Sequence, residues 1–404
     1  MRFRLSALRQ AYSGQFWLMF IGMLISTVGS SMIWPFLMIY VTERLQLPLT
    51  ATASLMTVNA AVGLTVSFIA GPLVDRVGRK WVMVVSLIGN GVVYFFLSRA
   101  DTLPAFALLM GLQGAFNPLY RIGSDAMMAD LIPPEKRPEA YSLLRMSNNA
   151  GISLGPAIGG FLAASSYTLA FYGATAGLCT YGLLILFFAR ETLSHAGREA
   201  VSAVKERFGG YDRIFRDRGF ISFNIAFTLT SICAMMVWSL MSVYSKENFG
   251  LTENLYGFIP TTNAVMVVLF QYAITRQTQR HRPLPVLTLG SAFYAVAIGS
   301  VALAQGFWGF WTSMVIMTVG ELIMVPTATT FVANLAPADM RGRYMSLYGL
   351  TWSVASGIGP VYGGFLNDNL GPQFIWLGGA LIGSFSLLLF LWLTRQEKTA
   401  HVTA

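Results

Sequence analysis

Apolar runs of about 20 residues recur along the whole chain, and each is long enough to cross a hydrocarbon core of about 30 Å. Charged residues make up 11% of the 404 residues, whereas soluble domains carry roughly 25%. The first apolar run, from Phe16, is too long for a cleaved signal region, so we expect it to be retained as the first helix. The sequence predicts an all-α membrane protein with twelve transmembrane helices in two six-helix bundles.

The expected spans follow the apolar runs between charged or proline-containing breaks. They cover residues 16–41 (with a kink at Pro35), 50–70, 81–97, 104–131, 139–163, 168–189, 220–244, 255–275, 285–304, 308–334, 340–366 and 374–393. The longest polar connection lies near the middle of the chain. It predicts an N-terminal bundle over 1–190, a cytoplasmic linker over 191–218 with an amphipathic segment at 199–208, and a C-terminal bundle over 219–404.

The positive charge is distributed unevenly between the two sides of these spans. Of the 27 Lys and Arg residues, 22 fall in the two termini and in alternate loops on one side. Only Arg44, Arg99 and Lys246 fall on the other side. By the positive-inside rule this predicts a multi-pass protein of a bacterial plasma membrane with both termini in the cytoplasm, and it argues against nucleic acid as a partner.

The sequence offers little to an enzyme or a metal site. Cys179 and Cys233 lie within predicted spans without ligand spacing, and the three histidines, His195, His281 and His401, lie in polar segments. Neither a metal motif nor a nucleophile–base pairing is present. We therefore expect no enzymatic activity, no metal and no cofactor.

A repeat at one fixed offset relates the two halves of the chain. Gly155–Leu162 returns as Gly359–Leu366, and Arg137 returns as Arg341, with no gap needed between Ala129 and Leu162. Parallel halves related about the membrane normal are a known plan of transporters. The repeat therefore predicts two bundles of one design, and a transport function.

A polar segment, Gly71–Lys80, links the second and third spans and reads G-P-L-V-D-R-V-G-R-K. It resembles the G-x-L-x-D-R-x-G-R-K signature of major facilitator superfamily transporters, in which an acid after the fourth span pairs with the signature. The alternative, a solvated turn, stays open. The resemblance implies the major facilitator fold and a conformational latch made of Gly71, Asp75, Arg76, Gly78, Arg79, Lys80 and Asp130.

The fifth span carries a run of small residues around Pro156. It resembles the G-x-x-x-G-P-x-x-G-G motif of the 12-helix proton-driven drug antiporters in the same superfamily, the bacterial multidrug efflux type. Small residues also allow helices to approach closely, and for each individual glycine this packing role is the favoured interpretation. The motif residues are Gly151, Gly155, Pro156, Gly159 and Gly160.

Glu321 lies near the middle of the tenth span, just before Pro326. A charge at this depth costs on the order of 3 kcal/mol, so the neutral acid is favoured and the group is suited to take up and release protons. The Gly-Glu pair before a proline resembles bacterial multidrug/proton antiporters, which implies a role in proton coupling. The alternative is a structural partner for an arginine.

The fourth and fifth spans contain further charges. Arg121 and Asp125 lie one helical turn apart, and Arg145 lies a few turns into the next span. They predict an Arg–Asp–Arg cluster on a cavity wall, with Asp125 as a second proton-coupling candidate, although simple mutual neutralisation is equally possible. Related drug antiporters carry an acid near position 145, so the arginine here puts selectivity for cationic drugs in doubt.

Amides lie within the spans as well, and Asn117 is the repeat equivalent of Glu321. The amides are Asn59, Gln113, Asn117, Asn148, Asn149, Asn263 and Gln271. Twenty Met and many aromatic residues suit an adaptable apolar pocket. The candidate substrate cavity comprises Arg121, Arg145, Asn117, Asn149, Trp238 and Trp352.

Together these features predict a secondary active transporter, in monomeric form, that exports amphipathic small molecules by alternating access and uses the proton gradient as its energy source. The partners are then a small amphipathic substrate, protons and membrane lipids. Export of a lipid or glycolipid, proton-coupled symport, and a non-transporting membrane receptor or scaffold remain as alternatives.

Overall fold

The computed structural model of the protein describes residues 12–133, 136–193, 211–337 and 340–402. Within these ranges the regular structure is helical and no strand occurs. Nine helices of this described part are long and apolar enough to span a membrane. Three more are as long but less apolar, so the long helices fit the twelve predicted spans. These three are α6 (Leu103–Leu131), α7 (Arg137–Ser165) and α16 (Arg341–Leu370).

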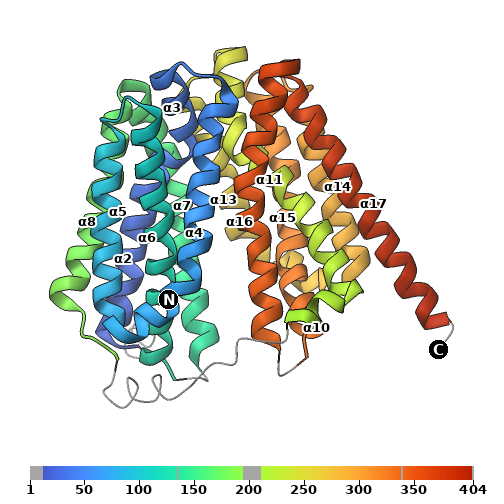
Figure 1. Ribbon diagram of the computed structural model, residues 1–404, viewed down its shortest axis with the longest axis horizontal. Helices are drawn as coiled ribbons and strands as arrows, with labels where there is room; N and C mark the ends of the chain where they lie inside the picture. The colour runs from blue at the N-terminus through green and yellow to red at the C-terminus, as the bar shows by residue number, and fades with distance from the viewer. Residues whose placement is uncertain (1–11, 134–135, 194–210, 338–339, 403–404) are drawn as a thin grey trace. The chain divides into compact units, whose positions relative to one another are not determined.

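The other elements follow in chain order and are labelled in Figure 1. The first half contains α2 (Gly14–Ile33), the 3-10 helix η1 (Trp34–Phe36), α3 (Leu37–Leu45), α4 (Leu49–Val77), α5 (Arg79–Leu97) and α8 (Tyr167–Phe188). The second half contains α10 (Tyr211–Arg216), α11 (Arg218–Phe249), α12 (Glu253–Tyr256), α13 (Phe258–Thr278), α14 (Pro283–Val301), α15 (Gly306–Leu335) and α17 (Phe374–Val402).

The structure confirms the expected kink at Pro35 but not the expected loop between the second and third spans. The kink expected at Pro35 is confirmed, because η1 interrupts the first span there. The expectation that Gly71–Lys80 is a polar loop is wrong, since α4 continues through Val77 and α5 begins at Arg79. Only Gly78 lies between the two helices, with a φ of 111° that favours glycine.

The predicted central linker is described only at its ends. The amphipathic segment expected at 199–208 lies outside the described residues. Near the end of the predicted linker, α10 forms a short helix and α11 begins at Arg218. The Asp217 side chain accepts a hydrogen bond from the Phe220 amide and so caps α11.

The chain divides into two compact units. The first consists of Met1–Trp34 with Ala61–Glu206, and the second of Pro35–Ala60 with Arg207–Ala404. Residues 35–60, which come from the first half of the repeat, therefore belong to the second unit. We refer to them as the 35–60 segment.

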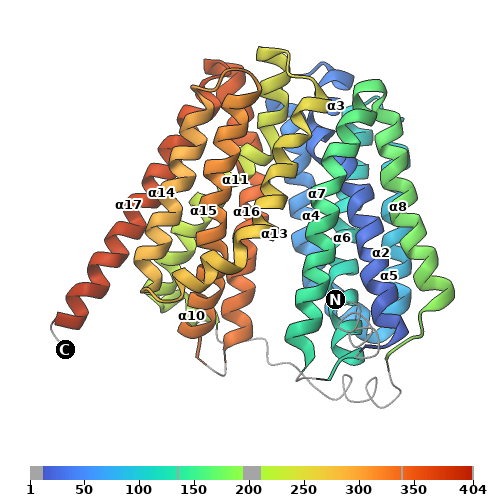
Figure 2. The same cartoon turned by 180° about the vertical axis from the view of Figure 1, so that it is seen from behind.

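The repeat offset extends over whole helices. The span Gly14–Leu45 corresponds to α11, and α5 corresponds to α14, with the first and last residues of each pair related by the same offset as Gly155 and Gly359. The first pair even ends alike, because Gln46 and Gly250 both adopt left-handed backbone angles, with φ of 52° and 64°. The helix pairings repeat too: α2 packs on α7 and α8, and α11 packs on α16 and α17 (Figure 2).

The glycine motif is a packing seam in both units. A Cβ on Gly155 would lie 2.8 Å from the Val28 carbonyl oxygen, and one on Gly359 would lie 3.1 Å from that of Ile232. The two glycines are repeat equivalents, and so are Val28 and Ile232. Gly151 and Gly159 likewise leave no room for a side chain against α2. The packing role favoured for these glycines is therefore what the structure shows, and it lets the helices approach closely.

Candidate functional site

A carboxylate lies in the middle of α15, where a side chain of α13 holds it. Asn263 Nδ2 donates to Glu321 Oε2 at 2.8 Å and to Thr318 Oγ1 at 2.9 Å. Thr318 and Glu321 share a face of α15 because they are three residues apart. Asn263 is 4% exposed and Thr318 is fully buried, whereas Glu321 is half-buried. Buried residues of α13 and α15 therefore orient the Glu321 carboxylate, while part of the glutamate side chain stays accessible.

A second polar contact joins the same two helices, and it depends on a proline. Pro326 has no N–H, so it cannot bond the Leu322 carbonyl four residues earlier. Gln271 Nε2 donates to that carbonyl oxygen at 3.1 Å. The proline that follows Glu321 therefore creates an acceptor, and α13 supplies the donor for it.

This contact predicts a stability effect. In Gln271→Leu the Leu322 carbonyl loses its donor inside the bundle, and we expect the free energy of unfolding to fall by about 1 kcal/mol. Denaturation of the purified protein in mixed micelles would measure it. Gln277→Leu is the matched control, because Gln277 is exposed on the same helix. An equal loss in both variants would contradict the role given to Gln271.

The first unit contains a related but uncharged arrangement. Asn90 Nδ2 donates to Asn117 Oδ1 at 2.9 Å. Asn117 is the repeat equivalent of Glu321, and Asn59 is the repeat equivalent of Asn263. The pair Asn263–Glu321 was missed from sequence, although both residues stood out as polar groups within the spans. Of the repeat-related positions 117 and 321, only the one in the second unit carries a carboxylate.

The predicted cluster of charges on α6 and α7 is not held together by ion pairs. Arg121, Asp125 and Arg145 are all exposed in the first unit. Within the described ranges, no ion pair joins any two of them. Tyr141 Oη of α7 donates to the Asp125 backbone carbonyl of α6 at 3.4 Å. Charged groups at membrane depth face water-filled cavities rather than lipid as a rule.

Of the other predicted cavity residues, Asn117 is exposed and three are half-buried, and they lie on both units. Asn149 belongs to the first unit, where the Thr27 hydroxyl donates to its neighbour Asn148. Trp238 and Trp352 belong to the second. The Trp352 ring stands edge-on to Phe227 at 6.0 Å between centroids. Trp352 is therefore partly engaged in packing α16 against α11.

Three of the predicted latch residues meet in the first unit. Arg79 forms ion pairs with Asp75 and Asp130, each at 3.1 Å. Glu191 was not foreseen: its carboxylate accepts from the Arg79 and Lys80 amides at 3.0 and 3.1 Å. A carboxylate at a helix N-terminus is favourable, so Glu191 acts as the cap that Gly78 cannot provide for α5. We call Asp75, Arg79, Asp130 and Glu191 the latch cluster.

The remaining latch candidates lie around this cluster. Gly71 is inside α4 with open space where a Cβ would be. Arg76 is exposed, and the Lys80 ammonium lies 5.5 Å from the centroid of the Trp81 ring.

Gly78 offers a test of the latch cluster. Gly78→Ala places a Cβ against the Glu191 carboxylate and forces alanine to a φ of 111°. We expect a loss of about 1–2 kcal/mol of stability and a slower transport cycle. Thermal unfolding and single-turnover transport rates would measure both. Gly71→Ala is the control, since its Cβ meets nothing and its helical backbone suits alanine. An unchanged cycle in Gly78→Ala would remove the cluster from the mechanism.

At the opposite end of α4, an acid from the second half caps a helix of the first half. Asp368 of α16 accepts from the Leu49 amide at 3.1 Å, the Thr50 amide at 2.8 Å and the Thr50 hydroxyl at 2.6 Å. Further along α4, the Thr57 hydroxyl donates to the Gly357 carbonyl at 2.5 Å. These bonds attach the 35–60 segment to α16 within the second unit.

A lysine attaches the same segment to α11. Lys246 forms ion pairs with Glu43 of α3 and with Glu253 of α12. Glu253 is 7% exposed, so its ion pair with Lys246 is largely removed from water. From the sequence, Lys246 served only as a marker of sidedness and nothing pointed to Asp368, because Glu43 and Thr50, their partners in the 35–60 segment, are distant from them in the chain.

Comparison with known proteins decides the family. The family model described as Major Facilitator Superfamily matches residues 19–247 and 223–404. The chain belongs to the Major Facilitator Superfamily. A Na(+), Li(+), K(+)/H(+) antiporter of Planococcus maritimus is 26% identical over 398 residues, with 90% of this chain and 91% of the relative covered. The multidrug resistance protein MdtH of Escherichia coli (strain SMS-3-5 / SECEC) is 25% identical over 340 residues, with 82% of each covered.

The solved structure of the nucleoside transporter NupG shares the fold, with a TM-score of 0.81 at 12% identity over 94% of this chain and 99% of that one. The superfamily membership and the membrane-spanning helices make the protein a secondary transporter of a bacterial membrane. In the part of the chain that the structure describes, no group of His, Cys, Asp and Glu is placed to hold a metal ion.

Proposed function

We propose that the protein exports amphipathic small molecules in exchange for protons, and that Glu321 is the proton-coupling residue. The observation that carries this proposal is the half-buried carboxylate held by Asn263 in the middle of α15. A carboxylate in a low-dielectric span is unfavourable when ionised and tolerable when neutral. Gain and loss of one proton therefore change the free energy of this site substantially.

Coupling requires that the protonated and ionised forms favour different conformations, because a ligand shifts only states that it binds differently. Asn263 donates to the carboxylate and so supports the ionised form in the observed arrangement. A rearrangement that separated α13 from Glu321 would favour the neutral acid. The latch cluster and the bonds of the 35–60 segment would then set the relative populations of the conformations.

The substrate class rests on two kinds of support. Trp238 and Trp352 are half-buried apolar surfaces in the second unit, and Arg121 and Arg145 are exposed cations in the first. An apolar body suits the first kind of surface, and an anionic or polar group suits the second. The similarity to a multidrug resistance protein supports export of such molecules.

A second candidate function is exchange of monovalent cations for protons. The similarity to a Na(+), Li(+), K(+)/H(+) antiporter favours it, and Glu321 and Asp125 each supply a carboxylate in their own unit. At Asp125, Arg121 one helical turn away opposes it, since it raises the cost of an additional cation there.

Proteoliposomes with an imposed proton gradient separate these functions. We expect proton efflux on addition of amphipathic dyes or anionic amphiphiles, and none on addition of Na⁺, Li⁺ or K⁺. Proton movement with the cations alone would replace the first proposal with the second. No proton movement with any of them would exclude both.

A further inference from the structure

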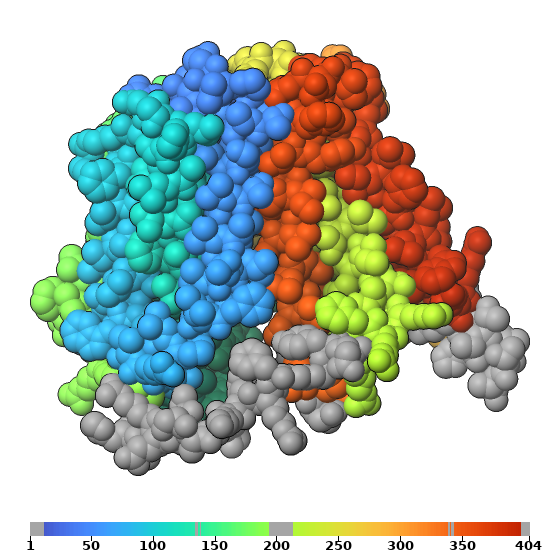
Figure 3. Space-filling model, viewed as in Figure 1, coloured from blue at the N-terminus to red at the C-terminus, as the bar shows by residue number. Residues whose placement is uncertain are grey.

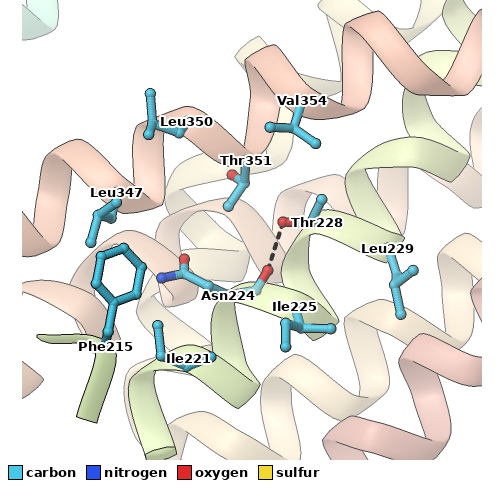
Figure 4. Close-up of a pocket in the computed structure, with 10 residues that line it drawn as sticks. All are labelled: Phe215, Ile221, Asn224, Ile225, Thr228, Leu229, Leu347, Leu350, Thr351 and Val354. Atoms are coloured by element: carbon cyan, nitrogen blue, oxygen red, sulfur yellow. Dashed lines mark hydrogen bonds between the residues drawn. The ribbon is translucent and has the colours of Figure 1, made fainter. Parts of the chain in front are cut away.

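A crevice of about 300 Å³ opens on the surface of the second unit between α11 and α16 (Figure 4). Side chains that are almost entirely apolar form its walls: Ile221, Ile225 and Leu229 from α11, and Leu347, Leu350 and Val354 from α16. Figure 3 shows that α11 reaches the molecular surface between α16 and α17. None of these residues belongs to the site around Glu321.

One polar group in the crevice lacks a partner. The Asn224 side chain lies among the lining residues, and its Oδ1 atom is buried without a hydrogen bond from any described residue. The two hydroxyls nearby are already used, because Thr228 donates to the Asn224 carbonyl at 2.7 Å and Thr351 to the Tyr348 carbonyl at 2.6 Å. A buried amide oxygen without a donor is unfavourable, and the amide nitrogen of the same side chain can donate to an acceptor on a ligand in the crevice.

The mouth of the crevice carries positive charge. Phe215, 64% exposed, marks this end, and Arg216 and Arg218 beside it are exposed. The acid between them is turned inward: Asp217 accepts from the Phe220 amide at 3.0 Å and from Tyr344 Oη at 2.9 Å. The two guanidinium groups therefore remain available to an anion, and Arg side chains match phosphate geometry well.

The stretch of α11 from Arg218 to Leu229, at the far end of the crevice, fits one leaflet of a bilayer. The eleven helical steps from Arg218 to Leu229 on α11 correspond to about 16 Å at a rise of about 1.5 Å per step. Half of a hydrocarbon core of about 30 Å is close to this value. Basic groups at the membrane surface above an apolar crevice are the arrangement that recognises anionic lipids.

We propose that this crevice binds one anionic glycerophospholipid. The phosphate lies between Arg216 and Arg218, an ester carbonyl of the glycerol region accepts from the Asn224 amide nitrogen, and one acyl chain runs along Ile225 and Val354. The occupant is a lipid rather than a soluble anion, because a soluble anion would leave the apolar walls and the Asn224 amide unused.

The test is retention of lipid by the full-length protein during native mass spectrometry. Protein in detergent is titrated with dioleoyl phosphatidylglycerol or dioleoyl phosphatidylcholine. We expect phosphatidylglycerol to bind more tightly. The double variant Arg216→Gln with Arg218→Gln should remove this preference. Each arginine is expected to contribute about a fivefold difference in affinity. Arg280→Gln with Arg282→Gln, which removes two exposed arginines elsewhere in the unit, should leave it unchanged.

Two further variants test the crevice itself. Val354→Trp fills it and should reduce retention of both lipids, while a monodisperse elution profile shows that the variant is folded. Asn224→Leu should weaken binding of dioleoyl phosphatidylglycerol, whose ester carbonyl accepts from the amide nitrogen, more than binding of the dialkyl ether analogue, which has no ester carbonyl. Equal binding of the two diacyl lipids by the unaltered protein, or full retention in Val354→Trp, would overturn the proposal.

Discussion

Glu321→Gln should abolish accumulation of substrate against its gradient when a proton gradient is the only energy source. Glutamine keeps the size of the side chain and its hydrogen bonding to Asn263, but it cannot release a proton. Downhill movement of substrate should persist and become independent of pH. Substrate affinity should change by less than about tenfold, or about 1.4 kcal/mol, because the apolar part of the substrate site is unaltered.

The measurement is dye transport in proteoliposomes at several pH values, with and without an imposed gradient. Glu321→Asp is the control that keeps the acid, and it should retain coupling. Asp125→Asn addresses the second candidate, which lies exposed in the first unit, and we expect a smaller effect there. Gradient-driven accumulation by Glu321→Gln with normal pH dependence would contradict the proposal.

Asp368→Ala should release the 35–60 segment from α16 and shift the balance of conformations. The substitution removes the three hydrogen bonds that the 35–60 segment donates to this carboxylate, two of them from the amides that begin α4. Hydrogen bonds to charged groups contribute about 1.5–3 kcal/mol, so a population shift of one to two orders of magnitude is expected. Cysteine accessibility or spin-label distances between the 35–60 segment and α16 would report it.

Asn369→Ala is the matched control for this variant. Asn369 is the next residue of α16, it is exposed, and its amide donates to the Phe365 carbonyl of its own helix. It should leave the population unchanged. If both variants behave like the unaltered protein, the bonds to Asp368 contribute to the fold but not to the conformational balance.

The sequence predicted the repeat better than it predicted the polar contacts within it. The offset that relates Gly155 to Gly359 was found over a single stretch of each half, and it holds for the bounds of entire helices. It also placed Asn117 and Glu321 at corresponding positions. Hydrophobic length and repeat spacing are properties of the chain in one dimension, so they can be read without coordinates.

Contacts between residues far apart in the chain could not be read in this way. Asn263 and Glu321 are 58 residues apart, and Asp368 and Thr50 are 318 apart. The partner of a polar group in a bundle depends on which helices are neighbours and on how each is rotated about its axis. The predicted cluster of Arg121, Asp125 and Arg145 shows the limit, because sharing a helix face did not make these side chains form ion pairs.

By itself, the sequence determined that this protein is helical, spans a membrane and consists of two related halves, because lipid admits only segments of the right length with satisfied backbones. It also singled out Glu321, since a charge within an apolar run is costly. The tertiary structure decided that Asn263 holds this acid and that Glu191 and Asp368 cap helices distant from them in sequence. It also decided that Lys246 joins two acids, because only the packing of helices brings such groups within hydrogen-bonding distance.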